Sequence, residues 1–245
     1  MSMDGAIVLH EFETLDSTNR LLLEMAASGS PCGTAVLARR QTGGRGRLGR
    51  SFSSPEGGIY VSILVPLSGP EENTSGIFVT AKAGVAVRRT VKEVCGKDCS
   101  IKWVNDIIYE GKKVCGILAQ GCGDKAVVGI GINYRTDMTL LPPDVQAIAS
   151  SLYGPQEKAP SAREFTESLL DNVWALCAGK EDENWLAEYK SSSTIVGKKV
   201  KIIQAGSVTG TGIATGIDGF CRLHVTDDGG RETVLSTGEV TIRED

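Results

Sequence analysis

Hydrophobic and polar residues follow two different spacings along this chain, and the spacings predict its strands and helices. Apolar, strand-like runs bounded by turn residues occupy residues 7–12, 34–38, 58–65, 100–109, 112–120 and 125–134. Apolar residues recur at helical spacing in residues 20–27, 75–94, 162–178 and 183–189. Short strands separated by Gly and Asp turns, typical of a small barrel, occupy residues 200–203, 206–217, 221–226, 233–235 and 239–243.

The connections between these elements indicate how the chain is divided. Glu110 and Gly111 separate two strand-like runs and predict a hairpin. Residues 136–154 are irregular and predict a second loop of some length. Residues 191–194 are three serines and a threonine, which is typical of a linker. A length of 245 residues fits one main domain with a small appendage.

An arginine-rich and glycine-rich segment, residues 40–50, lies between two of the predicted strands. Its glycines allow the backbone to approach a ligand closely, and its guanidinium groups suit phosphate and carboxylate. The Gly-Lys-Ser/Thr ending of a phosphate-binding P-loop is absent from the sequence of this segment, which argues against Walker-type ATP hydrolysis. An ordinary solvated loop and an RNA-binding tail remain alternatives on pattern alone.

Composition narrows the function further. A formal net charge of -4 argues against a general nucleic-acid binder, so the local basic segment is expected to serve a smaller anion. The sequence shows neither a long membrane-spanning apolar run nor a signal peptide, so a cytoplasmic protein is expected. The cysteines are odd in number, seven, and predict reduced thiols. Their spacing, with only two histidines, does not predict a protein-bound metal site.

Polar residues inside apolar runs mark further candidate positions. If residues 100–109 form one strand, Lys102, Val104 and Asp106 share a face. Lys102 and Asp106 then either pair with each other at a sheet edge or belong to a binding site. Residues 16–19, Asp-Ser-Thr-Asn, are typical of a helix cap and can also receive a polar, uncharged ligand group. Gly129 and Gly131 lie within a strand and indicate close approach of another backbone or a ligand, not a dinucleotide site.

Together these segments resemble the biotin-protein ligase family over nearly the whole chain. The matching motifs, in family order, are Asp16-Ser17-Thr18-Asn19, Gly44-Arg45-Gly46-Arg47-x-Gly49-Arg50, Lys102-Trp103-x-Asn105-Asp106, Lys113-x-x-Gly116-Ile117, Gly129-x-Gly131-Ile132-Asn133 and Gly238-Glu239-Val240-x-Ile242-Arg243. The resemblance implies an α+β fold, with a mixed β-sheet catalytic domain of the class II synthetase-like type in residues 1–190. It also implies a C-terminal SH3-like β-barrel in residues 195–245.

The resemblance implies a two-step reaction. ATP activates biotin as biotinoyl-5'-AMP with release of pyrophosphate, Mg²⁺ assists, and the biotinoyl group passes to a lysine of a biotin carboxyl carrier protein. Family members that also repress transcription carry a helix-turn-helix domain in front of the catalytic domain, whereas the first strand here begins by residue 7. DNA is therefore not an expected partner, and a homodimer is possible. A lipoate or octanoyl ligase and a non-enzymatic RNA-binding module are the alternatives.

The resemblance also implies residue roles. Biotin would be bound by Ser17, Thr18, Asn19, Gln41, Gly44, Arg45, Gly46, Arg47 and Lys113. The nucleotide would be bound by Arg47, Arg50, Phe52, Lys102, Asn105, Asp106 and Asn133. Lys113 and Arg47 would be catalytic, with Lys113 on the biotin carboxylate and an α-phosphate oxygen. Phe52 would lie against the adenine. How Lys102, Asn105 and Asp106 divide the phosphate and Mg²⁺ contacts stays open.

Overall fold

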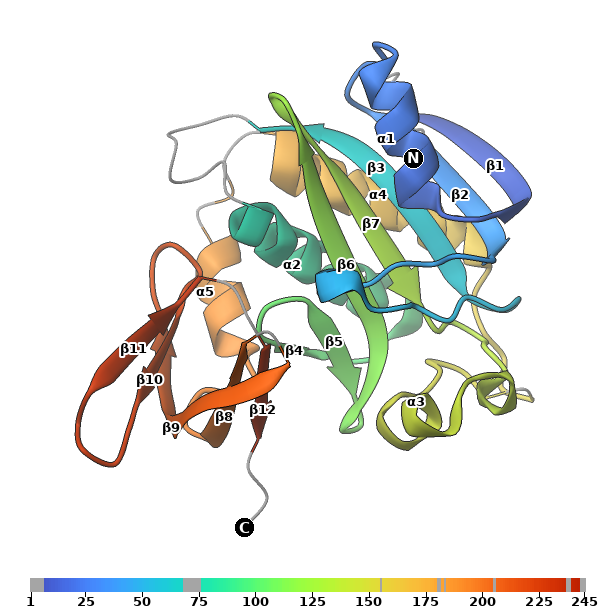
Figure 1. Ribbon diagram of the computed structural model, residues 1–245. Helices are drawn as coiled ribbons and strands as arrows, with labels where there is room; N and C mark the ends of the chain where they lie inside the picture. Colours follow the sequence, from blue (N-terminus) through green and yellow to red (C-terminus); the bar gives the residue numbers. More distant parts are fainter. Residues whose placement is uncertain are drawn as a thin grey trace.

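The computed structural model describes residues 7–67, 76–154, 156–179, 182, 184–204, 206–236 and 239–242. Within this part of the chain, a seven-stranded sheet carries helices on both faces, and a five-stranded sheet follows it (Figure 1). The expected α+β class with a mixed sheet and a small all-β unit is confirmed. Ser75, the expected start of a helix, and Gly238 and Arg243 of the last motif lie outside the described residues.

The larger sheet has the order β1-β2-β3-β7-β6-β5-β4. Its strands are β1 (Val8–Leu15), β2 (Thr34–Gln41), β3 (Ile59–Pro66), β4 (Ser100–Lys102), β5 (Asp106–Tyr109), β6 (Lys112–Cys122) and β7 (Lys125–Ile132). The β1–β2 pair is parallel and the other pairs are antiparallel, so the sheet is mixed. The predicted hairpin is the β5–β6 pair, and Gly111 turns it with a φ of 77°.

Helices cover the two faces of this sheet in unequal amounts. Helices α2 (Gly76–Cys95) and α4 (Ala162–Ala178) pack on one face and, with α5 (Trp185–Ser191), bury apolar residues in the main core together with the strands (Figure 1). Helix α1 (Thr18–Ala27) lies on the opposite face, where Leu22 packs with Val36, Leu64 and Val127. Side chains alternate between the faces of a strand, so the middle strands serve both cores.

Three connections differ from the sequence-based expectation. The run 100–109 is not one strand, because residues 103–105 form a turn between β4 and β5. Lys102 and Asp106 are therefore opposite each other across two strands, and the expectation that they share a face of one strand is wrong. Residues 136–154 contain a 3-10 helix, Met138–Leu140, and α3 (Pro143–Ile148). The expected linker is also tied to the sheet, since Ser192 O accepts a hydrogen bond from Ile101 N at 2.8 Å.

The smaller sheet is antiparallel, with the order β11-β10-β9-β8-β12. Its strands are β8 (Lys199–Gln204), β9 (Ser207–Ile217), β10 (Leu223–Thr226), β11 (Glu232–Leu235) and β12 (Glu239–Ile242). It contacts the larger sheet through Trp103, whose indole Nε1 donates to the Cys221 carbonyl at 2.9 Å. All seven cysteines are free thiols. A helix long and apolar enough to cross a membrane was not found among the described residues.

Candidate active site

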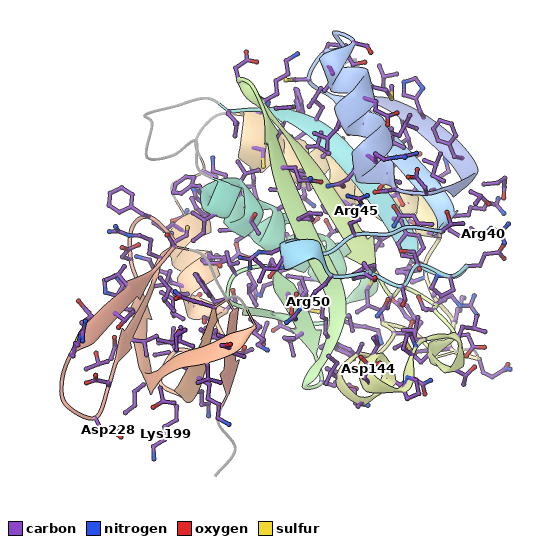
Figure 2. All side chains as sticks on the ribbon, in the orientation of Figure 1. Arg40, Arg45, Arg50, Asp144, Lys199 and Asp228 are labelled. Carbon is purple, nitrogen blue, oxygen red and sulfur yellow. The ribbon has the colours of Figure 1, made fainter. Side chains whose placement is uncertain are left out.

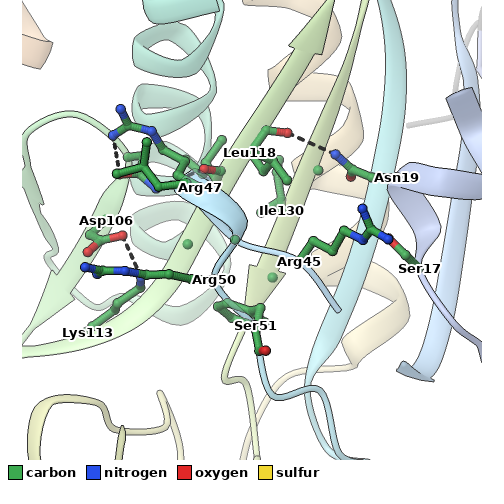
Figure 3. A pocket seen from close by; sticks show the side chains of 18 of the residues that line it. Ser17, Asn19, Arg45, Arg47, Arg50, Ser51, Asp106, Lys113, Leu118 and Ile130 are labelled. Atoms are coloured by element: carbon green, nitrogen blue, oxygen red, sulfur yellow. Dashed lines mark hydrogen bonds and ion pairs between the residues drawn. The ribbon is translucent and has the colours of Figure 1, made fainter. Parts of the chain in front are cut away.

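Residues 42–58, between β2 and β3, are called the crossing segment. A pocket lies where the crossing segment passes over the face of strands β5, β6 and β7 (Figure 3). Figure 2 shows Arg45 and Arg50 on this crossing segment, while Lys199 and Asp228 lie on the smaller sheet, away from it. The pocket wall collects thirteen of the residues predicted from sequence, which are Ser17, Thr18, Asn19, Gln41, Arg45, Gly46, Arg47, Arg50, Phe52, Lys102, Asn105, Asp106 and Lys113. The structure thus brings together motifs that are far apart in sequence.

Two predicted residues lie behind the wall instead of in it. Gly44 packs against residues 52–54, at the end of the crossing segment that returns toward β3. A Cβ added to Gly44 would lie 2.6 Å from Ser54 Oγ. Asn133 is buried, and its Nδ2 donates to the Ser150 carbonyl at 3.1 Å. Through this bond Asn133 connects the end of β7 to the chain that follows α3. In this arrangement both residues support the wall.

The N-terminus of α1 forms the polar end of the pocket. Ser17 is the N-cap and accepts from Arg20 N at 3.4 Å, as the cap motif predicts. Thr18 N and Thr18 Oγ1 lie 2.8 Å and 3.1 Å from Gln41 Oε1. Gln41 Nε2 in turn donates to Ser54 Oγ at 2.9 Å. Hydroxyl and amide groups without net charge therefore gather at this end.

Asn19 fastens α1 to the sheet. Its Nδ2 donates to the Leu118 carbonyl at 3.2 Å and to Gln120 Oε1 at 2.9 Å (Figure 3). A Cβ on Gly129 would overlap Asn19 Oδ1, so only glycine at position 129 leaves room for this side chain. The sequence indicated close approach of another backbone or a ligand at Gly129, whereas the structure places a side chain of α1 there.

The crossing segment folds back on itself over the sheet. Gln41 N donates to Ser54 O at 3.0 Å, Phe52 N to Gly44 O at 2.9 Å and Gly46 N to Arg50 O at 2.7 Å. The bend at its tip uses left-handed backbone angles at Leu48 (φ 57°) and Gly49 (φ 75°). Leu48 is 67% exposed and lines the pocket, so an apolar side chain lies at the mouth of the pocket.

Phe52 lies in a slot made by two glycines. A Cβ on Gly131 would lie 2.5 Å from the Phe52 ring, and one on Gly116 would lie 3.1 Å from it. The ring also meets Tyr60 edge-on, with centroids 6.4 Å apart. The glycines of the β6 and β7 motifs therefore let an aromatic side chain from the crossing segment lie directly on the sheet.

Cationic groups form the other end of the pocket. Lys113 Nζ lies 2.6 Å from Asp106 Oδ1, and Arg47 Nη1 donates to Asn105 Oδ1 at 3.2 Å (Figure 3). Both ion-pair side chains are partly buried, at 29% and 24% exposure, so their attraction is less screened than at the surface. Asp106 thus lines the pocket, and its ion-pair partner is Lys113 on β6.

A hydrogen bond from helix α5 holds the turn that includes Asn105 and precedes Asp106. Tyr189 Oη donates to the Val104 carbonyl at 3.1 Å, and burial raises the pKa of Tyr189 well above its ordinary value, which keeps the hydroxyl protonated. Burial likewise raises the pKa of Cys115 well above that of a free thiol. Cys115 is therefore a protonated core residue and not a nucleophile for the adjacent pocket.

Sequence reasoning missed several residues of the site. Val240 of β12 lines the pocket although it comes from the smaller sheet. The polar network is completed by Ser62, Ser54 and Gln120. These three residues do not line the pocket and do not belong to the matching motifs. For Ser62 a signal was available, because it is a small hydroxyl residue inside the apolar run Ile59–Pro66.

Comparison with known proteins agrees with this geometry. Residues 11–137 match the Biotin/lipoate A/B protein ligase family, and residues 195–243 match the Biotin protein ligase C terminal domain. The chain therefore belongs to the biotin/lipoate A/B protein ligase family. The two matches together make it an enzyme of the biotin protein ligase type.

Individual relatives support the same class. The biotin--[acetyl-CoA-carboxylase] ligase of Mycobacterium tuberculosis is 32% identical over 231 residues, which are 91% of this chain and 85% of that protein. The bifunctional ligase/repressor BirA of Bacillus subtilis is 36% identical over 156 residues, 61% of this chain and 47% of that protein. The structure of the Aquifex aeolicus biotin protein ligase in complex with biotin and ATP superimposes with a TM-score of 0.80 at 29% identity, covering 97% of this chain and 99% of that one.

Proposed function

We propose that the protein activates biotin with ATP and transfers the biotinoyl group to a lysine of a biotin carboxyl carrier protein. In the first step a carboxylate oxygen attacks the α-phosphorus, and the bond to the departing pyrophosphate breaks. In the second step the lysine nitrogen attacks the acyl carbon, an amide forms, and AMP and a proton leave. The observation that carries the proposal is one pocket with an uncharged polar end and a cationic end.

The uncharged end suits the ureido ring of biotin. Ser17, Thr18 and Gln41 offer donors and acceptors there, while Asn19 holds the N-terminus of α1 on the sheet. Arg45 and Gly46 add backbone groups from the crossing segment, and Gly44 lets that segment turn back beside Ser54. A ring that both donates and accepts hydrogen bonds requires such a mixed set of groups, because unpaired polar groups in a closed site cost affinity.

The cationic end suits the activation step. A carboxylate and an α-phosphate repel each other, so catalysis depends on holding them together with positive charge. Lys113 and Arg47 stand at this end, and Arg50 and Lys102 line it as well. We assign Lys113 to the biotin carboxylate and α-phosphate, and Arg47 and Arg50 to the phosphates. Phe52 then offers its ring to the adenine from the slot above Gly131.

Mg²⁺ would enter with the nucleotide. Mg²⁺ keeps several waters and takes one or two carboxylates in addition to phosphate oxygens. Among the described residues, Asp106 is the one carboxylate that lines the pocket, and a cluster of three ligating side chains was not found there. This donor set fits a metal carried by ATP. Asp106 would contribute the protein oxygen, and the ion would neutralise phosphate charge.

The partners follow from the chemistry and from the relatives. The names of the Mycobacterium tuberculosis and Paracoccus denitrificans relatives specify acetyl-CoA carboxylase, so a carrier domain of such a carboxylase is the acceptor we propose. Residence in the cytoplasm, where ATP and carboxylases occur, belongs to the same proposal. Sedimentation with and without biotin and ATP would determine whether the protein forms a homodimer.

Pyrophosphate exchange into ATP tests the first step. We expect exchange with biotin, and none with lipoate or without an acid. Lys113→Ala should lower the rate by about a hundredfold or more, since it removes a charge that acts in the transition state. Lys112→Ala is the matched control, because Lys112 is the exposed neighbour on β6 and does not line the pocket.

Intact mass of a carrier domain tests the second step. Incubation with biotin, ATP and Mg²⁺ should add one biotinoyl group to one lysine. Exchange that depends on lipoate in place of biotin would overturn the proposal in favour of a lipoate ligase. Binding of RNA without any exchange would overturn the assignment as an enzyme.

A further inference from the structure

A buried serine lies directly beneath the polar end of the pocket. Ser62 on β3 has no exposed surface, and its Oγ lies 2.8 Å from Thr18 Oγ1 and 2.7 Å from Asn19 Oδ1. Ser62 does not line the pocket. Any effect it has on a ligand must therefore pass through Thr18 or Asn19.

Two backbone groups fix the orientation of the neighbouring amides. The Leu118 carbonyl can only accept, so the Asn19 atom 3.2 Å from it is the amide nitrogen, and Asn19 Oδ1 faces Ser62. The Thr18 backbone N–H can only donate, so the Gln41 atom 2.8 Å from it is Oε1. Hydrogen positions follow from satisfying such a network. Asn19 and Gln41 thus each present an oxygen to the hydroxyl groups between them.

Three oxygen–oxygen contacts in this network share two hydroxyl protons. The contacts are Ser62–Asn19 at 2.7 Å, Ser62–Thr18 at 2.8 Å and Thr18–Gln41 at 3.1 Å. A contact without a proton is repulsive, and the repulsion is weakest in the longest one. The favoured arrangement therefore has Ser62 donating to Asn19 and Thr18 donating to Ser62. The proton of Thr18 is then directed into the protein.

We propose that Ser62 is a positioning residue that makes the Thr18 hydroxyl an acceptor toward the pocket. With its proton engaged by Ser62, Thr18 Oγ1 presents only lone pairs to a ligand. It therefore selects an N–H group at this position and repels a carbonyl or ether oxygen. The inference rests on the proposed function, in which the matching group is an N–H of the biotin ureido ring.

The test compares biotin binding by Ser62→Ala with that of the unchanged protein. Loss of one directing hydrogen bond should raise the Kd for biotin, measured by titration calorimetry, by about tenfold. In steady-state assays the KM for biotin should rise while the KM for ATP and kcat stay unchanged. Thr166→Val is the control for loss of a buried hydroxyl, since Thr166 Oγ1 donates to Ala162 O of its own helix at 2.7 Å and does not line the pocket. We expect it to leave the Kd unchanged.

A double-mutant cycle separates this role from general loss of structure. In a Thr18→Val background, Ser62→Ala should change the Kd by less than about twofold, because the hydroxyl that it directs is gone. An effect of Ser62→Ala that persists in full in that background would overturn the proposal, as would an unchanged Kd in Ser62→Ala alone.

A conservative variant keeps the inference testable if Ser62→Ala folds poorly. Ser62→Cys retains a weak donor and acceptor of similar size, so its Kd should exceed that of the unchanged protein by less than about tenfold. A rise of about tenfold or more in the Kd of Ser62→Cys would contradict the proposal. If the unchanged protein failed to bind biotin, the proposed function would fail first, and the two failures would be distinguished.

Discussion

Arg47 joins two motifs of the site through one side chain. It comes from the crossing segment and donates to Asn105 on the turn between β4 and β5. We expect Arg47→Gly to open this contact and to release the activated acid into solvent, where the mixed anhydride reacts with any nearby amine. Biotin should then appear on lysines of a bystander protein, which mass spectrometry of mixed reactions would detect.

The control for this prediction is Arg163→Gly on α4. Arg163 is an exposed arginine that pairs with Glu167 on its own helix at 2.9 Å. Its loss should leave labelling confined to the carrier lysine. Carrier-only labelling by Arg47→Gly at the unchanged rate would show that Arg47 does not retain the intermediate.

At the scale of residues, the sequence predicted the charged members of the site better than the uncharged ones. Arginines and lysines in glycine-rich motifs indicate an anion before any contact is known. Ser62 gave only the signal of a polar residue in an apolar run, and its role depends on Thr18 and Asn19, which reach it from another element. The partner of Asp106 was left open because the turn at residues 103–105 was interpreted as strand.

At the scale of elements, the contact between α1 and the sheet depends on a glycine of β7. A methyl group on Gly129 would overlap Asn19 Oδ1. We therefore expect Gly129→Ala to displace the N-terminus of α1, to lower the free energy of unfolding by about 1–3 kcal/mol and to weaken biotin binding. Urea unfolding and calorimetry would measure the two effects.

The matched substitution is Gly121→Ala on the neighbouring strand β6. An added Cβ there meets nothing within 4 Å, so the same chemical change occurs without overlap. Its unfolding free energy and biotin affinity should stay close to those of the unchanged protein. Equal losses in both variants would indicate a general cost of alanine in these strands and would remove the assigned role of Gly129.

Helices and strands were predictable where the spacing of apolar residues matches the face that the element buries. The helices α1, α2 and α4 and the strands β2, β3, β6 and β7 lie close to their expected positions because each has a clear apolar face. Strand order was not predictable, since β7 pairs with β3 across a long sequence separation. Helix α3 was missed because its six residues, starting at Pro143, are too few for a helical period to be visible.

At the scale of the whole molecule, one hydrogen bond joins the two sheets next to the site. The buried indole of Trp103 donates to Cys221 O, 118 residues away in the sequence. We expect Trp103→Phe to destabilise the protein by about 1–3 kcal/mol, because it leaves a buried carbonyl without its donor. Since Trp103 belongs to the turn that includes Asn105 and leads into Asp106, the KM for ATP should also rise.

Hydrogen exchange at residues 218–226 and pyrophosphate exchange kinetics would check this prediction. Trp174→Phe on α4 is the comparison, as Trp174 is a half-buried tryptophan that does not line the pocket. Faster hydrogen exchange only in Trp103→Phe is the expected result. An unchanged KM for ATP would mean that the hydrogen bond holds the sheets together without shaping the pocket.

The contact between the two sheets was not predictable from the sequence, because the sequence around Trp103 does not indicate Cys221 as its partner, nor the reverse.

The ion pair between Lys113 and Asp106 has a consequence for selectivity. A stray inorganic anion that approached Lys113 would have to compete with a carboxylate tethered in the same molecule, whose local concentration far exceeds that of any dissolved salt. A lone phosphate would gain little from this exchange. A bulky acid that also fills the uncharged end brings enough extra contact to displace Asp106. The tethered carboxylate thus raises the binding free energy that any anion must supply before it can pair with Lys113.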